Sequence, residues 1–230
     1  MDWFFANTEL IGRLTALHLY QAVIPLLLGV LIAIPLAQAA RLHRGLGGFI
    51  LGSSAVLYTI PSLALFVLLP VLLGTRVLDI TNVIVALTLY AVALLVRSTV
   101  DALNSVDDDV RQAATAMGYR PLRRFFAVDL PLAVPVLFAG LRVISVSNMS
   151  LVSVGALLGI DSLGRLFMDG LYRNFPTEIV IGIALILLLA LVLDLVLVLA
   201  QRLLTPWTRA ARNGVPRLPV AAVEARTAAS

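Results

Sequence analysis

Long apolar segments, separated by short stretches that carry most of the charges, dominate the pattern of this chain. Five of them approach or exceed the roughly 20 residues that a helix needs to cross a membrane: residues 17–40, 45–75, 80–96, 134–158 and 178–199. The second is long enough to include a break at Pro61, because proline lacks the N–H that a helix interior needs. The pattern predicts an all-α polytopic membrane protein with about five transmembrane helices, built as one domain over residues 1–207.

The composition agrees with that pattern and excludes several kinds of site. Apolar residues make up 60% of the 230 residues and the mean hydropathy is +1.01, values typical of polytopic membrane proteins. Cysteine is absent, which excludes disulfides and thiolate metal sites, and His18 and His43 are too far apart in the sequence for metal-ligand spacing. Residues 208–230 are rich in Ala, Pro and Arg, and we expect them to form a disordered tail.

Lysine is also absent, so all 17 basic residues are arginine. A phosphate-binding loop of the G-x-x-x-x-G-K-[ST] type needs its lysine. The chain therefore cannot supply a standard ATPase site, and we expect it to hold no cofactor and to be a transport subunit rather than an enzyme. If ATP and Mg drive this protein, another polypeptide binds them.

The distribution of arginine predicts the orientation in the membrane. With the N-terminus outside, the outer segments hold four arginines and Arg142 lies inside a span. The inner loops and tail hold twelve: Arg41, Arg44, Arg97, Arg111, Arg120, Arg123, Arg124, Arg202, Arg209, Arg212, Arg217 and Arg226. Because cytoplasmic loops are enriched in basic residues, we expect residues 101–129 and the C-terminus in the cytoplasm. The surroundings are a lipid bilayer, and we expect no nucleic-acid partner.

The loop over residues 101–129 carries signals for two short helices. Ser105 begins a capping box with an acid at its fourth position, and further acids favour a first helical turn. A helix over Asp109–Met117 should end at Gly118, which suits the left-handed conformation after a helix. Pro121 can begin the second helix. The small side chains of the first helix would let another protein approach closely, and an ordinary solvated loop is the alternative.

Two charges lie well inside predicted spans, Arg142 in the fourth and Asp194 in the fifth. A charged side chain at the centre of a bilayer costs about 2.5–3.5 kcal/mol on insertion scales, so each needs a partner or a route to water. Both lie toward the cytoplasmic half of the membrane. They predict either an ion pair that ties the two spans together or separate snorkelling of each side chain to the interface.

Polar residues in two other spans are candidates for a transport pathway. The break at Pro61 frees a backbone carbonyl, and irregular backbone inside a membrane is tolerated where it is buried in protein or lines a cavity. Thr59 and Ser62 beside it could hydrogen-bond that gap or face a substrate. Tyr58 and Tyr90 could offer a cation–π contact, although packing is the commoner role. The fourth span is unusually polar, which places it centrally, along the pathway or a subunit interface; its candidates are Ser145, Asn148 and Ser150.

Charges of alternating sign recur every four residues between the last two spans, at Asp161, Arg165, Asp169 and Arg173. This spacing gives ion pairs between residues i and i+4 on one helix face. It predicts a short amphipathic helix on the external surface, which either caps the bundle or meets a protein that delivers substrate.

The segment from Gln112 to Pro131 resembles the EAA loop of bacterial ABC-importer permeases. Gln112 stands where the family has Glu, and Val128 where it has Ile. The motif at the family's spacing comprises Gln112, Ala113, Ala114, Gly118, Val128, Leu130 and Pro131, of which the other five match the family's residues. In that family the loop is cytoplasmic and inserts a short helix into a groove on a separate ATPase subunit. The resemblance therefore implies that these residues form an ATPase-coupling loop.

Further segments resemble the osmoprotectant permeases, which import glycine betaine, carnitine, choline or related quaternary amines. These segments are Thr59–Leu65, Leu89–Ala91, Val96–Thr99, Ala139–Arg142, Leu163–Gly164, Gly170–Leu171, Leu193–Asp194 and Leu203–Trp207. Residues 160–162 depart from the family, which usually has small residues ending in Gly-Gly there. The resemblance implies a methionine-permease-like ABC importer fold in the bacterial cytoplasmic membrane. It also implies three kinds of partner: a second, identical or related permease subunit, two ATPase subunits and an external binding protein.

Two other functions remain open on the sequence. One is a self-contained channel or ion-coupled carrier, although the spans lack the chain of carboxylates that a proton relay uses and show no inverted repeat. The other is the permease of a methionine-type or other small-solute importer. The cargo is not fixed by this chain, because in this family the external protein usually selects it.

Overall fold

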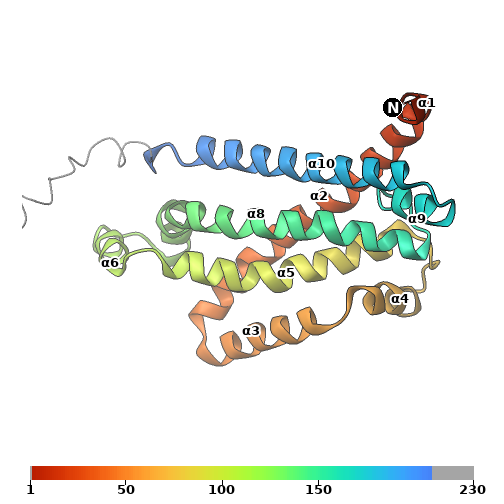
Figure 1. The fold of residues 1–230 in the computed structure, drawn as a ribbon. Helices are drawn as coiled ribbons and strands as arrows, with labels where there is room; N and C mark the ends of the chain where they lie inside the picture. Colours follow the sequence, from red (N-terminus) through yellow and green to blue (C-terminus); the bar gives the residue numbers. More distant parts are fainter. Residues whose placement is uncertain (1, 209–230) are drawn as a thin grey trace, which may run out of the picture.

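The computed structural model describes residues 2–208, which form a bundle of long helices and, within that range, no strand (Figure 1). The elements are α1 (Asp2–Ala6), α2 (Thr8–Leu42), α3 (Arg44–Thr59), α4 (Ser62–Leu73), α5 (Ile80–Asn104), α6 (Asp108–Ala116), α7 (Pro121–Arg124), a π-helical turn (Phe125–Asp129), α8 (Leu130–Gly155), a 3₁₀ turn (Ala156–Leu158), α9 (Arg165–Tyr172) and α10 (Pro176–Leu204). In this range four helices are long and apolar enough to cross a membrane, and the bent pair α3–α4 makes a fifth candidate. The predicted all-α polytopic fold with about five spans is confirmed.

The long helices continue past the apolar segments that mark them in the sequence. α2 begins at Thr8 and α5 ends at Asn104, both beyond the predicted spans. Hydropathy marks the part of a helix that suits lipid, whereas the backbone stays helical until other groups satisfy its terminal N–H and C=O. At the start of α5 the Asp79 carboxylate does so, accepting a hydrogen bond from Thr81 N at 2.9 Å.

α5 lies at the centre of the bundle and packs on α2, α3 and α8 (Figure 1). Three apolar clusters follow one another along it, and each combines side chains from α2, α5 and α8. Leu87, Leu95 and Leu103 of α5 lie one in each cluster and are fully buried. α10 packs on α8 and α9 at the edge, and of its residues, all of which are described, Glu178 and Gly182 alone are buried. The other faces of α10 are left to lipid or to another subunit.

Two glycines permit the closest contacts between helices. A Cβ atom on Gly29 of α2 would lie 2.7 Å from the Cβ of Ala91, and one on Gly140 of α8 would lie 1.8 Å from Ser98 Oγ. Both distances are far below van der Waals contact, so larger side chains would force the helices apart. Ser98 and Gly140 belong to two of the segments that resemble the permeases. Those segments therefore meet where α5 packs on α8.

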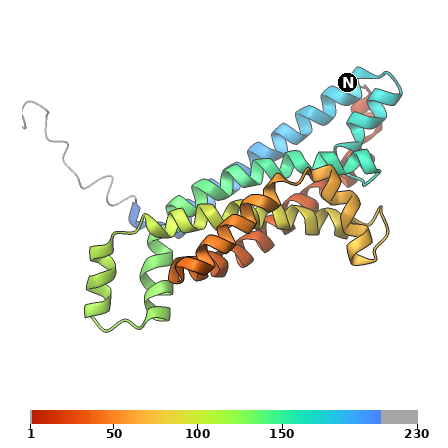
Figure 2. The ribbon, with the colours of Figure 1, turned by 90° about the horizontal axis from the view of Figure 1, so that it is seen from below.

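The loop between α5 and α8 lies at the end of the bundle opposite to α9 (Figure 2). In Figure 2, α6 and α7, drawn in green, project beyond the long helices at one end, whereas α9, in cyan, lies close to the N-terminus at the other. This arrangement puts the two predicted partner-binding regions at opposite ends of the spans. The predicted disordered tail, residues 208–230, lies outside the described residues apart from Thr208.

Candidate functional site

The loop between α5 and α8 begins with α6, whose first turn is capped by Asp107. The Asp107 carboxylate accepts a hydrogen bond from the Asp109 N–H at 2.8 Å, which satisfies one of the free donors of a helix start. The predicted capping box at Ser105 is wrong, because the Ser105 hydroxyl instead donates to the Ala102 carbonyl of α5 at 2.8 Å. α6 therefore starts one residue earlier than the sequence predicted.

Gly118 ends α6, as predicted. Its φ of +84° lies in the left-handed region. The Gly118 N–H donates to the Thr115 carbonyl at 2.9 Å, and the Tyr119 N–H donates to the Ala114 carbonyl at 3.2 Å. This pair of hydrogen bonds is the Schellman arrangement, which satisfies carbonyls that are left free at a helix end. The chain then turns, and α7 begins at Pro121, again as predicted.

α7 continues into α8 through a π-helical turn, Phe125–Asp129. Such turns are bonded from residue i to i+5, here from the Leu130 N–H to the Phe125 carbonyl, and they occur often at functional sites. Two half-buried motif residues lie here: Val128 within the turn and Pro131 in the first turn of α8. Because the helix is continuous, a displacement of α7 passes directly to α8 without a flexible linker.

Four charged side chains meet between the two helices of the loop, and we call Asp108, Arg111, Arg124 and Asp129 the loop ion cluster. Asp129 is buried, and its two carboxylate oxygens lie 3.4 Å from Arg111 Nε and 3.5 Å from Arg124 Nε. Arg111 also pairs with Asp108 and donates to the backbone carbonyl of Leu103 near the end of α5. The cluster thus connects α5, α6 and the continuous helix α7–α8, and it was not among the predicted site residues.

The surface that the loop presents differs from the predicted one. Ala114, which was expected to let a partner approach, is 2% exposed and lies inside the loop, whereas Gln112 and Ala113 are exposed. Large apolar side chains protrude instead, with exposed fractions of 72% at Met117, 76% at Leu122 and 65% at Phe126. Large exposed apolar side chains of this kind suit a contact with another protein or with the membrane.

The second span is broken at the predicted place. α3 and α4 are bent by 105° at Ile60 and Pro61. The Tyr90 hydroxyl of α5 donates to the Ile60 carbonyl, and the Tyr58 ring stands edge-on to the Tyr90 ring with 5.9 Å between centroids. Both tyrosines are thereby engaged with the protein itself, which favours the packing role that the sequence left open. Tyr90 holds the elbow between α3 and α4.

The three candidate pathway residues of this span lie at the elbow. Thr59 and Pro61 are exposed, and Ser62 is half-buried. The Thr59 hydroxyl donates to the Val56 carbonyl at 2.7 Å, while the Ile60 N–H donates to the Leu57 carbonyl. Thr59 thus satisfies a carbonyl in the last turn of α3 beside the break, which was one of its two predicted roles. Open apolar hollows of about 620 and 640 Å³ adjoin the elbow, one along α3 and one along α4. The elbow therefore borders a large apolar surface of the single chain.

Two of the three candidate pathway residues on α8 point into the bundle. Ser145 and Asn148 are each 1% exposed. The Ser145 hydroxyl donates to the Arg142 carbonyl at 2.8 Å, and Asn148 Nδ2 donates to the Ala22 carbonyl of α2 at 3.4 Å. Ser150 is exposed. Ser145 and Asn148 are therefore engaged inside the single chain, and Ser150 is the candidate that α8 leaves exposed.

Two further polar residues of α2, which the sequence did not single out for this role, make contacts across the bundle, one with α8 and one with the segment between α8 and α9. His18 and Gln21 are fully buried. His18 Nε2 lies 3.1 Å from the Met149 carbonyl, and Gln21 Nε2 donates to the Asp161 carbonyl at 2.7 Å. Some polar side chains of these spans therefore hold segments of the bundle together.

The structure joins Arg142 of α8 to Asp194 of α10. Arg142 Nε and Nη2 donate to the two carboxylate oxygens of Asp194 at 2.6 and 2.7 Å. Such bidentate, charge-assisted pairs are among the strong hydrogen bonds of proteins. Of the two arrangements that the sequence left open, this is the ion pair, and it attaches the edge helix α10 to the bundle.

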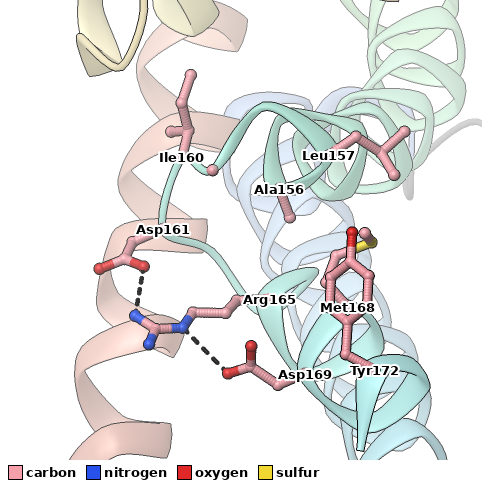
Figure 3. Close-up of a pocket in the computed structure, with 9 residues that line it drawn as sticks. Ala156, Leu157, Ile160, Asp161, Arg165, Met168, Asp169 and Tyr172 are labelled. Carbon is pink, nitrogen blue, oxygen red and sulfur yellow. Dashed lines mark hydrogen bonds and ion pairs between the residues drawn. The ribbon is translucent and has the colours of Figure 1, made fainter.

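The predicted ladder of charges is present at the opposite end of the bundle (Figure 3). Arg165 lies 2.9 Å from Asp161 and 3.2 Å from Asp169, while Arg13 of α2 lies 2.9 Å from Asp161 and Arg173 lies 3.8 Å from Asp169. The helix is shorter than predicted, because α9 begins at Arg165 and Asp161 precedes it. A cavity of about 310 Å³ opens beside the ladder.

Residues 26–210 match the protein family described as the inner membrane component of binding-protein-dependent transport systems. The chain belongs to this family. It is 32% identical to the osmoprotectant import permease protein OsmW of Salmonella typhimurium, over 87% of this chain and 94% of that protein. It is 33% identical to the choline transport system permease protein OpuBB of Bacillus subtilis, over 82% of this chain and 86% of that protein.

The fold of this inner membrane component is also found in solved transporters. A chain of the methionine ABC transporter MetNI in an inward-facing conformation superposes with a TM-score of 0.69, over 84% of this chain and 96% of that chain, at 21% identity. The methionine-permease-like fold implied by the sequence is therefore confirmed. The family match confirms the resemblance carried by the motif segments and makes the chain a multi-pass transport subunit.

Proposed function

We propose that this permease subunit forms part of the membrane pathway of an ATP-driven importer for osmoprotectants and other quaternary amines, such as glycine betaine, carnitine and choline. The cargo named for the relatives OsmW and OpuBB supports this class. An external binding protein delivers the cargo at the end of the bundle that carries α9. The N-terminus lies outside and the C-terminus in the cytoplasm, as the distribution of arginine favours.

The loop between α5 and α8 is the observation that carries this proposal. It is a compact pair of helices, closed at Gly118 and continuous with α8, and it exposes Met117, Leu122 and Phe126. A partner that covers these side chains would move α8 with them. We assign the partner as the ATPase subunit, which holds ATP and Mg, and the motif residues from Gln112 to Pro131 as its coupling loop.

The elbow between α3 and α4 is the part of the chain best suited to face the pathway. Thr59 and Pro61 are exposed there, Ser62 is half-buried, and the adjoining hollows are apolar and open. A second permease subunit, a copy or a close relative of this chain, would cover these hollows and close the pathway between the two subunits. Ser150 of α8 is the remaining exposed candidate.

The substitution Leu122→Glu tests the docking of the ATPase subunit. A buried leucine contributes about 1.5–3 kcal/mol, so its replacement by a charge should weaken docking by at least roughly 10- to 150-fold. The tagged chain is purified from membranes of its own host, and the amount of ATPase subunit recovered per permease is measured by mass spectrometry. Leu171→Glu, at an exposed leucine of α9 at the opposite end, is the matched control. Equal recovery of the ATPase subunit with both variants would contradict the assignment.

A further inference from the structure

α6 has almost no apolar anchor of its own. Of its residues, all of which the structure describes, Ala114 alone is buried, and an alanine side chain buries little surface. The helix packs mainly on α7 and on the π-helical turn. A helix of 9 residues is too short to be stable without partners. What holds α6 in place must therefore be largely polar.

The loop ion cluster supplies that polar attachment, and Asp129 is its centre. Asp129 is 1% exposed, and each of its carboxylate oxygens faces a different guanidinium, Arg111 of α6 on one side and Arg124 of α7 on the other. Arg124 Nη1 also donates to Thr115 Oγ1 of α6 at 3.0 Å. α6 is thus connected to the continuous helix α7–α8 through the buried carboxylate of Asp129 and through the hydrogen bond from Arg124 to Thr115.

The π-helical turn explains how Asp129 and Arg124 come to lie together. In a regular α-helix two residues five apart point about 140° away from each other. A π turn is bonded from residue i to i+5, which brings residues five apart nearly above one another. Arg124 immediately precedes the turn and Asp129 ends it. The turn therefore aims the carboxylate of Asp129 back toward the loop.

We propose that Asp129 is the positioning residue that holds α6 on the base of α8, and this role rests on the proposed function in that α6 belongs to the coupling loop. Without the carboxylate, Arg111 and Arg124 would face each other as like charges, and Arg41 of α2 adds a third positive charge nearby. Asp108 is the neighbouring acid, but its side chain is 81% exposed, so water screens it. Loss of Asp129 should therefore push α6 away from α8 rather than merely loosen it.

Hydrogen exchange in the full-length chain in lipid nanodiscs tests the positioning role directly. Asp129→Asn keeps the shape of the side chain and removes its charge, and the amides of α6 should then exchange at least about tenfold faster, because local opening becomes easier. The control is Asp101→Asn, at an exposed acid of α5 that forms no ion pair with the side chains the structure describes. Unchanged exchange of α6 in Asp129→Asn, equal to that of the control, would overturn the proposal.

A second substitution separates charge balance from a general loss of packing. Arg111→Gln added to Asp129→Asn removes one of the two facing positive charges, so α6 should regain part of its protection. A double variant that exchanges even faster than Asp129→Asn would overturn the electrostatic account. If Asp129→Asn does not insert into membranes, Arg111→Gln alone must speed the exchange of α6, since it breaks the same link, and its failure to do so would likewise refute the positioning role.

The role of α6 in coupling is measured separately, by ATP hydrolysis, so that the positioning role of Asp129 and the proposed function can fail independently. In the complex with its ATPase subunit and binding protein, Asp129→Asn should lower the ratio of substrate-stimulated to basal ATP hydrolysis at least about fivefold, while Asp129→Glu restores part of it. Faster exchange of α6 together with an unchanged ratio would support the positioning role and refute α6 as the coupling element of the proposed function.

Discussion

Gly118→Ala measures how much the turn at the end of α6 depends on a backbone conformation that glycine alone adopts easily. Gly118 has a φ of +84°, and a Cβ atom at this position would meet no atom within 4 Å in the described chain. The substitution therefore adds no steric clash with other residues, so its effect reports the free-energy cost of the left-handed backbone conformation alone. A left-handed conformation costs an L-residue about 1–2 kcal/mol.

That cost acts on the two hydrogen bonds that close the turn, from Gly118 to Thr115 and from Tyr119 to Ala114. An extra 1–2 kcal/mol corresponds to roughly 5- to 30-fold more opening. We expect the amides of residues 118 and 119 to exchange faster by that factor in the nanodisc-embedded chain. Gly118→Asn should show a smaller effect, because asparagine tolerates the left-handed region better than alanine.

Gly12→Ala is the matched control for this experiment. Gly12 lies within α2, its φ is not positive, and a Cβ atom there also meets nothing within 4 Å of the described chain. Alanine in a helix is favoured over glycine by about 1 kcal/mol, so this variant should be neutral or stabilising. If Gly118→Ala leaves the exchange of residues 118 and 119 as slow as Gly12→Ala does, the left-handed turn is not what closes the loop.

Two further predictions concern the membrane helices. Tyr90→Phe removes the hydroxyl that satisfies the carbonyl at the elbow, so it should lower the free energy of unfolding by about 1–3 kcal/mol, measured by denaturant titration in detergent; an unchanged midpoint would show that the bond does not hold the elbow. Arg142→Ala or Asp194→Ala should lower the yield of monodisperse protein in size-exclusion chromatography, and the swap Arg142→Asp with Asp194→Arg should recover part of it. Single variants with the same yield as the original chain would refute a role of the pair in assembly, and single variants with lower yield that the swap does not raise would refute the pairing as its cause.

The membrane helices could be located from the sequence because their length and apolar composition are set by the bilayer. Their ends could not, since α2 and α5 continue into polar sequence where backbone hydrogen bonds still favour a helix. The break at Pro61 was predictable from the missing N–H, but its partner was not: Tyr90 is 30 residues away and reaches the elbow only through the packing of α5. Long-range partners of this kind depend on the tertiary structure.

In the candidate site, too, local backbone features could be predicted from the sequence and long-range partners could not. Gly118 and Pro121 were predictable because each has a local backbone role that few other residues fill. Asp129 was missed because in a regular α-helix two residues five apart point about 140° away from each other, and the π turn that brings Asp129 toward Arg124 has no clear sequence signal. The burial of Ser145 and Asn148 could not be predicted, because polarity alone does not tell which neighbour a side chain faces; Ser145 bonds its own helix and Asn148 bonds α2.

Uptake by the reconstituted complex tests the central claim most directly. The chain, its second permease subunit and its ATPase subunit are placed in proteoliposomes with ATP inside and the binding protein outside, and uptake of radiolabelled choline, glycine betaine and carnitine is measured. We predict uptake that requires both ATP and the binding protein, that stops with a non-hydrolysable ATP analogue, and that persists when ion gradients are collapsed. Uptake that follows an ion gradient without ATP would contradict the claim.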